Sequence, residues 1–512
     1  MNSLAIIGAI LAYFGALYGI SRITGKEANE ASYFRGNRAS PWYVVAFGMI
    51  GASLSGVTFI SVPGWVGTSA FSYLQMVLGY LIGYVVIAEV LIPLYYRHNL
   101  TSIYGYLGQR FGRCTYSTGA AFFLVSRVIG ASFRLFLVAL VFNLVFERLG
   151  FQVPFFVPVL ISVALISVYT RRGGIKTVVW TDTLQTACLL SAALLSVVWI
   201  LQRLDLPVSH LWSTVATSPH ASIWVWDWQA PNHLVKHLLS GAFIAIVMTG
   251  LDQDMMQKNL TCRTASESQK NIYWFCVILV LANVLFLTLG VLLYHFGEAQ
   301  GIVMLNGTTG GSLEIKDPGT GEWIARGTDE LYPILAMDYL DSWVMLTFTL
   351  GLIAAAYSSA DSALTALTTS FCVDFLKFEL QSQLESDRRK TRERVQFGFA
   401  TLIFVTIVVF ERINDQAVIQ SIFKVAGFTY GPLLGLYSFG LLTERSVRDS
   451  WVPTVCVMAP SLTYLADRFL PLWVDFEFGF LVLLMNGALT FFGLWFISRP
   501  RKPSDTGPWS AH

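Results

Sequence analysis

Long apolar runs alternate with short polar segments along the whole chain. A helix needs about 20 apolar residues to cross the hydrocarbon core of a bilayer. The pattern therefore predicts an all-α polytopic membrane protein with about 13 transmembrane helices. The expected helices span 3–21, 42–64, 71–96, 117–148, 153–170, 179–202, 236–257, 270–297, 342–376, 395–413, 417–442, 451–468 and 475–498.

The polar segments differ in charge from one to the next. The first holds Arg22, Lys26, Arg35 and Arg38, whereas the second holds no Lys or Arg. This alternation continues to a basic tail, and basic loops stay in the cytoplasm. We therefore expect a plasma-membrane protein with its N-terminus outside and its C-terminus inside. The longest loops, 203–235 and 298–341, are expected to be surface segments with short helices.

Composition agrees with a membrane protein and excludes some functions. The 512 residues are 54% hydrophobic and only 13% charged, against about 25% charged in soluble proteins. The net charge of +2 gives no basic footprint for a nucleic-acid partner. None of the seven histidines pairs with a cysteine or carboxylate cluster, which argues against an enzyme. The six cysteines are expected in helices or on the cytoplasmic side, with no disulfide framework.

A polar cluster interrupts the apolar segment 351–371, "GLIAAAYSSADSALTALTTSF". Ala355, Ser358, Ser359 and Ser362 recur at spacings of three and four, so they share one helix face. Hydroxyls and carbonyls are hard oxygen donors that suit alkali cations. Close helix packing by small residues is the alternative. Asp361 has no such packing role, because a charge in a bilayer costs several kcal/mol unless it is partnered.

The segment 48–67, "GMIGASLSGVTFISVPGWVG", carries several glycines and Pro63. Interrupted helices in transporters expose backbone carbonyls that bind ions. A continuous helix packed closely through its small residues is the alternative.

Charged residues lie inside other predicted helices. Arg127 and Arg134 are seven residues apart on one helix face, and a buried arginine needs an anion. That anion is either a structural carboxylate such as Glu89 or Asp252, or an anionic substrate.

Three other positions also allow two interpretations. Asp182 is either an interfacial cap or part of a cation site. Lys424, near an outer helix end, either reaches the interface or enters a site. Asp252 and Asp254 are expected to cap or pair at the cytoplasmic surface.

Five segments together resemble the sodium/solute symporter family over residues 1–445. They are "TSIYGYLGQRFG" at 101–112, "GGIKTVVWTD" at 173–182, "DQDMMQK" at 252–258, "AAAYSSADSALTAL" at 354–367 and "GPLLGLYSFGLL" at 431–442. One departure is Gly105, where many members carry Glu. The resemblance implies two inverted five-helix repeats, 41–203 and 236–442. Residues 1–40 precede them, and 443–512 add two helices and a tail.

The resemblance also implies a sodium site between the second and ninth predicted helices. Carried over by position, its ligands are Gly51, Leu54, Ala355, Ser358 and Ser359. A second sodium in some members implies a possible further site here at Asp182, Asp361 and Ser362. Asp361 stands where sialic acid symporters have a serine.

The resemblance favours an anionic substrate. Leu279 stands where sugar-transporting members have Lys, and Lys424 stands where they have Gln. The arginine of the sialic acid members aligns near Gly130, between Arg127 and Arg134. These positive groups predict a carboxylate substrate such as sialic acid, another acidic sugar or a small monocarboxylate. Thr58 and Gln75 are expected to add polar contacts.

The predicted function is sodium-coupled symport of a small organic solute by alternating access. Sodium is the co-transported ion, and the lipid bilayer is the surrounding medium. A membrane sensor that binds the same ligand without moving it is the alternative.

Overall fold

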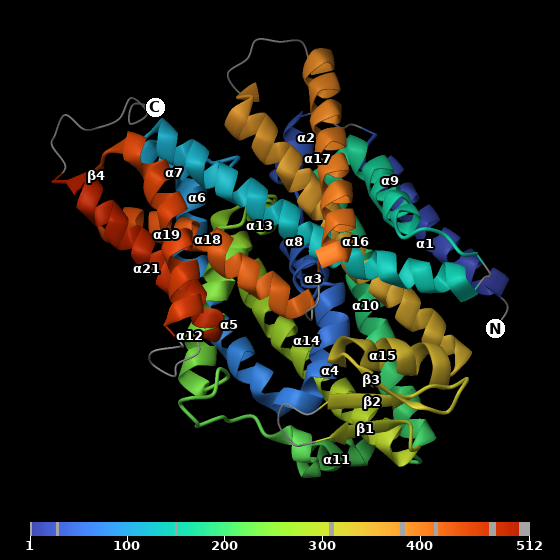
Figure 1. The fold of residues 1–512 in the computed structure, drawn as a ribbon. Coiled ribbons are helices and arrows are strands. Elements are labelled where there is room, and N and C mark those ends of the chain that lie inside the picture. Colours follow the sequence, from blue (N-terminus) through green and yellow to red (C-terminus); the bar gives the residue numbers. More distant parts are fainter. Residues whose placement is uncertain are drawn as a thin grey trace.

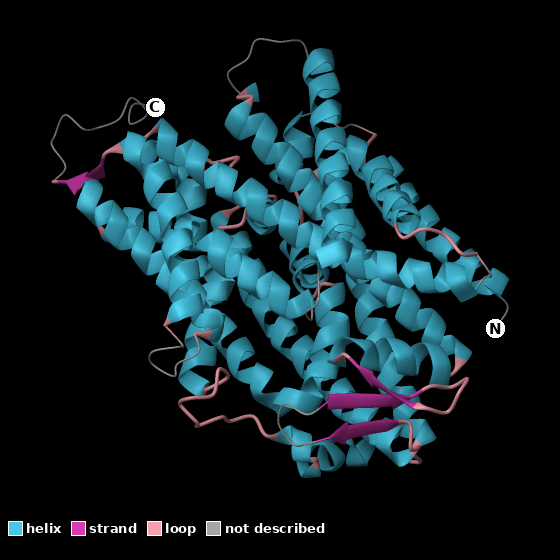
Figure 2. Ribbon diagram, in the orientation of Figure 1, coloured by secondary structure: helices cyan, strands magenta, loops and turns pink. Residues whose placement is uncertain are grey.

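The computed structural model describes residues 3–26, 30–148, 151–306, 312–378, 385–413, 418–470 and 478–500. It is a bundle of helices with small strands (Figure 2), and each of the thirteen predicted ranges contains a helix. The helices in these ranges are α1 Ser3–Thr24, α3 Trp42–Ser53, α4 Gly56–Ser69, α5 Tyr73–Val86, α6 Ile92–Arg97, α8 Arg113–Arg148, α9 Phe156–Gly173, α10 Ile175–Arg203, α12 Leu234–Ala245, α13 Gln253–Asn259, α14 Ala265–Ala299, α16 Ser342–Ser370, α17 Glu385–Ile413, α18 Val418–Leu442, α19 Val452–Phe469 and α21 Val482–Ile497. Shorter helices include α2 Glu30–Arg35, α7 Gly105–Arg110, α11 Leu211–Thr217 and α15 Leu331–Ile334.

The lengths and apolar compositions of the helices suit a membrane. Among the described residues, eight helices are long and apolar enough to cross a bilayer. A ninth span results if the bent pair 234–250 and 253–259 counts as one. The all-α membrane architecture is confirmed, whereas the count of thirteen transmembrane spans stays a prediction.

The predicted interruption in 42–64 lies between α3 and α4. The N–H of Leu54 donates to the carbonyl of Ile50 at 2.7 Å, and the next residue, Ser55, has extended backbone. The helix restarts at Gly56 and continues through Pro63. The break therefore falls at Leu54 and Ser55, nearer the middle of the range than Pro63.

A second break, in the predicted helix 236–257, was not foreseen. The chain bends by 70° between residues 250 and 253. The cause is Asp252, whose carboxylate accepts hydrogen bonds from the N–H groups of Asp254 and Met255 and so starts α13 as a new helix. The surface position expected for Asp252 and Asp254 is wrong, because both side chains are fully buried.

The long segment 298–341 folds partly as a sheet, which sequence periodicity did not reveal. Strands β1 Val303–Asn306, β2 Ser312–Lys316 and β3 Trp323–Arg326 pair antiparallel in sequence order. Between β2 and β3, Asp317 accepts hydrogen bonds from the N–H groups of Thr320 and Gly319. These bonds lower the pKa of Asp317. The sheet lies at the end of the molecule opposite α7 (Figure 1).

Glycines allow α5 and α12 to pack with their backbones almost in contact. A methyl group added at Gly241 would lie 2.1 Å from the carbonyl oxygen of Met76. A methyl group added at Gly79 would lie 2.3 Å from the carbonyl oxygen of Leu238. Small residues are the usual means of bringing membrane helices together.

We predict that Gly241→Ala lowers the free energy of unfolding by about 1–3 kcal/mol, because the added methyl must push two helices apart. Thermal unfolding of the purified protein in detergent measures this loss. Gly398→Ala is the matched control, since nothing lies within 4 Å of the added methyl. Equal stability of the two variants would contradict the close α5–α12 contact.

Candidate functional site

The break between α3 and α4 faces α10 and α16 at close range. A methyl group added at Gly51 would lie 2.5 Å from Thr186 Oγ1 and 3.3 Å from Ser358 Oγ. Ser359 Oγ donates to the carbonyl of Ala52 at 3.3 Å and, on its own helix, to the carbonyl of Ala355 at 3.4 Å.

The structure therefore brings the five expected sodium ligands to one junction. Each of them is buried. Two lie at the end of α3, and three lie on the facing part of α16. They are Gly51, Leu54, Ala355, Ser358 and Ser359.

Asp182 lies inside the bundle on α10 and is fully buried, so it is not an interfacial cap. Its Oδ1 accepts a hydrogen bond from Ser358 Oγ at 2.6 Å. Its Oδ2 lies 2.7 Å from Nζ of Lys258, a residue of α13 that is also buried. A lysine ammonium thus already neutralises this carboxylate. The sequence analysis missed Lys258, although the segment "DQDMMQK" contains it.

The other two residues of the possible second sodium site have different partners. Asp361 Oδ2 accepts a hydrogen bond from the Tyr169 hydroxyl of α9 at 2.7 Å. Its other oxygen, Oδ1, has no hydrogen-bond partner among the described residues. Ser362 Oγ donates to Asp254 Oδ2 at 3.1 Å and to the Ser358 carbonyl at 2.9 Å. One buried carboxylate oxygen is therefore free to accept a cation or a proton donor.

Arg127 on α8 is paired with protein carboxylates. Its guanidinium contacts Asp254 and lies 3.8 Å from Asp252. Asp252 also accepts a hydrogen bond from the hydroxyl of Tyr430 on α18. Of the two partners that the sequence suggested, Asp252 is near and Glu89 is not, since Glu89 accepts from Tyr273 instead.

These charges form one group, here called the core charge cluster. Its members are Asp182, Asp252, Asp254, Asp361, Lys258, Arg127 and Arg134. With four carboxylates and three cations, its formal charge is −1 if every member is ionised. An excess charge in a low-dielectric interior is costly unless a counter-ion joins it.

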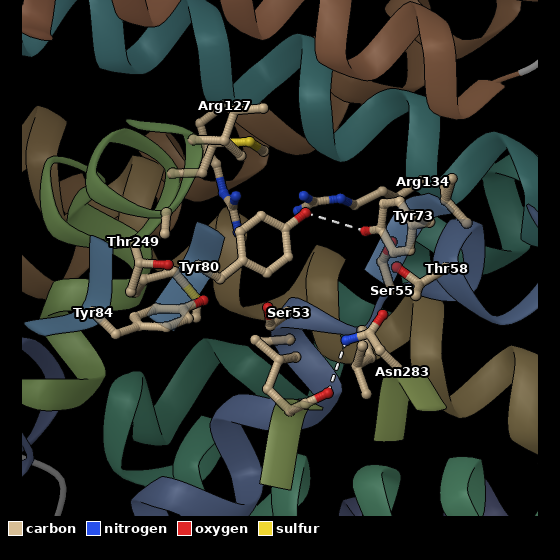
Figure 3. A pocket seen from close by; sticks show the side chains of 18 residues that line it. Ser53, Ser55, Thr58, Tyr73, Tyr80, Tyr84, Arg127, Arg134, Thr249 and Asn283 are labelled. Atoms are coloured by element: carbon tan, nitrogen blue, oxygen red, sulfur yellow. Dashed lines mark hydrogen bonds between the residues drawn. The ribbon is translucent and has the colours of Figure 1, made fainter. Parts of the chain in front are cut away.

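A cavity of about 90 Å³ lies beside the α3–α4 break. Figure 3 shows its polar side chains, with Arg127 and Arg134 pointing inward from the same side. The polar lining consists of Ser53, Ser55, Thr58, Tyr73, Tyr80, Tyr84, Thr249, Asn283, Arg127 and Arg134. No Asp or Glu lines the cavity among the described residues.

Arg134 is the cation of this cavity that the protein leaves unpaired. It is 7% exposed, and its Nε and Nη1 have no hydrogen-bond partner among the described residues. No carboxylate of the described chain lies within ion-pair distance of it. The hydroxyls of Tyr73 and Tyr80 lie 3.1 Å apart and are hydrogen-bonded to each other (Figure 3). This arrangement can bind an anion that also carries a hydroxyl or carbonyl group.

The sequence analysis missed Asn283, which enters the cavity one turn after Leu279. Its amide donates to the Leu279 carbonyl at 2.8 Å. A single amide in the apolar run "VILVLANVLF" was the available signal.

Of the expected substrate residues, Thr58 lines this cavity but Lys424 and Gln75 do not. The Lys424 side chain is 57% exposed, and its Nζ lies 4.0 Å from Asp467. This position agrees with the interfacial alternative. Gln75 is buried and accepts a hydrogen bond from the N–H of Val225, so it anchors the loop before α12.

Comparison with known proteins places these features in a family. Residues 33–448 match the model of the sodium:solute symporter family. The mouse sodium-coupled monocarboxylate transporter 1 is 24% identical, over 85% of this chain and 67% of its own length. The sodium/sialic acid symporter NanT of Aliivibrio fischeri is 23% identical, over 86% of this chain and 84% of its own.

The fold also matches solved transporter structures. The substrate-bound, outward-open structure of a Na⁺-coupled sialic acid symporter has a TM-score of 0.78 at 18% identity. The match covers 97% of this chain and 99% of that one. This likeness establishes the fold.

We predict that Lys258→Met destabilises the protein by about 3–5 kcal/mol, because it leaves Asp182 buried without its cation. The thermal unfolding midpoint in detergent measures the loss. Lys270→Met, at an exposed position of α14, is the matched control and should change little. A midpoint equal to that of the control would show that the Lys258–Asp182 pair does not stabilise the fold.

Proposed function

This chain belongs to the sodium:solute symporter family, and from that premise we propose that it imports a small organic anion together with sodium. It is a multi-pass membrane protein, and sodium is its co-transported ion. The observation that carries the anionic substrate is Arg134, a buried guanidinium whose Nε and Nη1 have no hydrogen-bond partner among the described residues and which lines a cavity that also contains hydroxyl and amide groups. The match covers 67% of the length of the mouse relative. The transport activity of that relative therefore applies to this chain only as part of the proposal.

The sodium ion binds where α3 breaks against α16. The proposed ligands are the carbonyls of Gly51, Leu54 and Ala355 and the hydroxyls of Ser358 and Ser359. The break supports this assignment, because it leaves carbonyls of the α3 end without helical partners. The core charge cluster supports it as well, because one sodium balances its formal charge of −1.

Two broken helices support the division into inverted repeats, 41–203 and 236–442. Each repeat starts with a broken helix, α3–α4 in the first and α12–α13 in the second. Residues 1–40 and 443–512 flank this core. Such helices lie at the midplane binding sites of transporters that rock one repeat against the other.

The volume of the cavity favours a short monocarboxylate over sialic acid. At about 10–15 Å³ for each water, 90 Å³ holds about six to nine water-sized groups. A short hydroxy or keto acid fits that room, with its carboxylate on Arg134 and its oxygen among Tyr73, Tyr80 and Asn283. The name of the mouse relative is in line with this substrate class.

A second sodium is proposed at Asp182, Asp361 and Ser362. Asp361 Oδ1 is the free oxygen that such an ion would find. Lys258 competes for Asp182, so binding of the ion there requires the ammonium to withdraw. Two sodium ions and one carboxylate would bring the formal charge of the core charge cluster from −1 to zero.

Sodium binding at the α3–α4 break would tie the broken helix to α16 and complete the substrate cavity beside it. By linkage, sodium and substrate then raise each other's affinity by the same factor. The membrane potential adds about 2.3 kcal/mol per charge for each 100 mV. We place the protein in the plasma membrane with its C-terminus in the cytoplasm, following the basic loops.

A sensor that only binds the ligand has no support from the named relatives, which are transporters. No step of symport requires covalent chemistry, so we propose that the protein is not an enzyme.

We predict that purified protein in liposomes takes up labelled lactate when an inward sodium gradient is present. Ser359→Ala should raise the sodium concentration for half-maximal uptake about 10-fold or more, because a ligand to a charged group is lost. Ser461→Ala, exposed on α19, is the matched control. A Hill coefficient for sodium above one in the wild type requires more than one ion, and its fall to one in Asp361→Asn would support the second site.

Gradient-dependent lactate uptake with the same sodium dependence in Ser359→Ala would refute the proposed ion site. Sialic acid, glucuronate, proline and galactose are tested beside lactate. Binding of any of them without gradient-driven uptake would return the sensor as the better interpretation.

We predict that Arg134→Gln lowers the affinity for the transported anion at least about 30-fold, since losing a buried charge partner costs about 2–5 kcal/mol. Lys424→Gln should leave it within about twofold, because that side chain is exposed. Uptake assays with labelled lactate measure both. Sodium-driven uptake of a neutral solute that is unaffected by Arg134→Gln would overturn the anionic assignment and keep the symporter.

A further inference from the structure

A second pocket lies at the end of the molecule opposite the sheet, away from the substrate cavity. Its volume is about 290 Å³. The loop between α6 and α7, the start of α8 and the segment after η9 Phe371–Phe375 form its walls. Figure 1 shows α7 far from β1–β3. No part of the proposed transport function uses this pocket.

The polar side chains of this pocket include several hydrogen-bond donors. Arg113, Lys377, Gln109 and Asn99 line it together with His98. No Asp or Glu lines it, and neither Arg113 nor Lys377 forms an ion pair, within the described ranges. The Lys377 ammonium lies 6.0 Å from the centre of the Tyr116 ring.

A buried hydroxyl in this pocket also lacks a partner. Ser102 is 4% exposed, and its Oγ has no hydrogen-bond partner among the described residues. Leaving a buried polar group unsatisfied is costly, so this hydroxyl has a hydrogen bond to offer to a ligand or a water in the pocket. The neighbouring carboxylate, Asp374, is already engaged by the hydroxyls of Tyr116 and Ser370.

The loop that carries Ser102 is held in place from both sides. Gln253 of α13 donates to the Thr101 carbonyl and accepts from the Ile103 N–H, each at 2.9 Å. Arg35 donates to Thr101 Oγ1. The pocket wall is therefore fixed to α13, the helix that also carries Lys258 of the core charge cluster.

We propose that this pocket binds a phosphate-bearing anion, with Arg113 and Lys377 as its charge partners and Ser102 as a hydroxyl donor. A guanidinium and an ammonium are the usual partners of phosphate, and no Asp or Glu of the described residues lines the pocket itself. The ligand is either an anionic phospholipid headgroup or a soluble phosphate compound. Through Gln253, an occupied pocket would hold α13 in the position that pairs Lys258 with Asp182.

Two probes distinguish a soluble phosphate compound from a phospholipid headgroup as the ligand. Isothermal titration with inorganic pyrophosphate, on full-length protein in detergent, tests a soluble ligand. Thermal unfolding in nanodiscs of phosphatidylcholine with or without phosphatidylglycerol tests a lipid headgroup. Both are run without sodium or substrate gradients, so failure of the transport proposal leaves this test intact.

We expect at least one probe to bind or stabilise the wild type, with affinity reduced at least about tenfold in Arg113→Gln/Lys377→Gln. Ser102→Ala, which keeps the charge, should weaken binding about tenfold, as for a hydrogen bond to a charged group. Lys270→Gln, exposed and outside the pocket, should match the wild type. No effect of either probe on the wild type, or equal effects on all four proteins, would overturn the proposal.

Discussion

The pairing of Lys258 with Asp182 is the interaction around which the interior of this protein is organised. A bilayer offers no solvent to buried charges, so each must find a partner inside the bundle. The pair joins α13 to α10, and Ser358 adds α16. Arg127, Asp254 and Asp252 extend the network to α8 and, through Tyr430, to α18. Helices that are far apart in sequence are thus held by a few charges whose sum, −1, leaves room for a cation.

In this fold, buried polar and charged side chains lie beside the breaks in the helices. A break leaves carbonyls and N–H groups unsatisfied, which is tolerated only inside protein or beside a cavity. At α3–α4 the free carbonyls face the hydroxyls of α16, and this suits a small cation. At α12–α13 the carboxylate of Asp252 accepts hydrogen bonds from the N–H groups at the start of α13. Asp252 is itself part of the core charge cluster. The same backbone irregularity therefore supports the proposed cation site in one half and holds an anchored carboxylate in the other.

Two arginines on one helix illustrate how neighbours decide function. Arg127 and Arg134 lie on the same face of α8 and both line the cavity, yet Arg127 also contacts Asp254, whereas Arg134 forms no ion pair among the described residues. The ion pair of Arg127 supports the fold, and Arg134 is the arginine that we propose for the ligand. The donor-lined pocket at the far end is similar, because Arg113 and Lys377 form no ion pair among the described residues.

The sequence by itself determined the all-α membrane class, thirteen ranges that each contain a helix, and the Ser/Asp face of α16, and it offered the α3–α4 break as one of two alternatives. Apolar length, glycines and helical periodicity are local properties, so a single segment carries them. Only the tertiary structure decided that Lys258 faces Asp182, that the helix at 250–253 bends, and that 303–326 forms strands. It also removed Lys424 and Gln75 from the cavity and added Asn283. The reason is physical: whether a buried polar side chain is satisfied depends on partners from other helices, and no single segment of the sequence contains them.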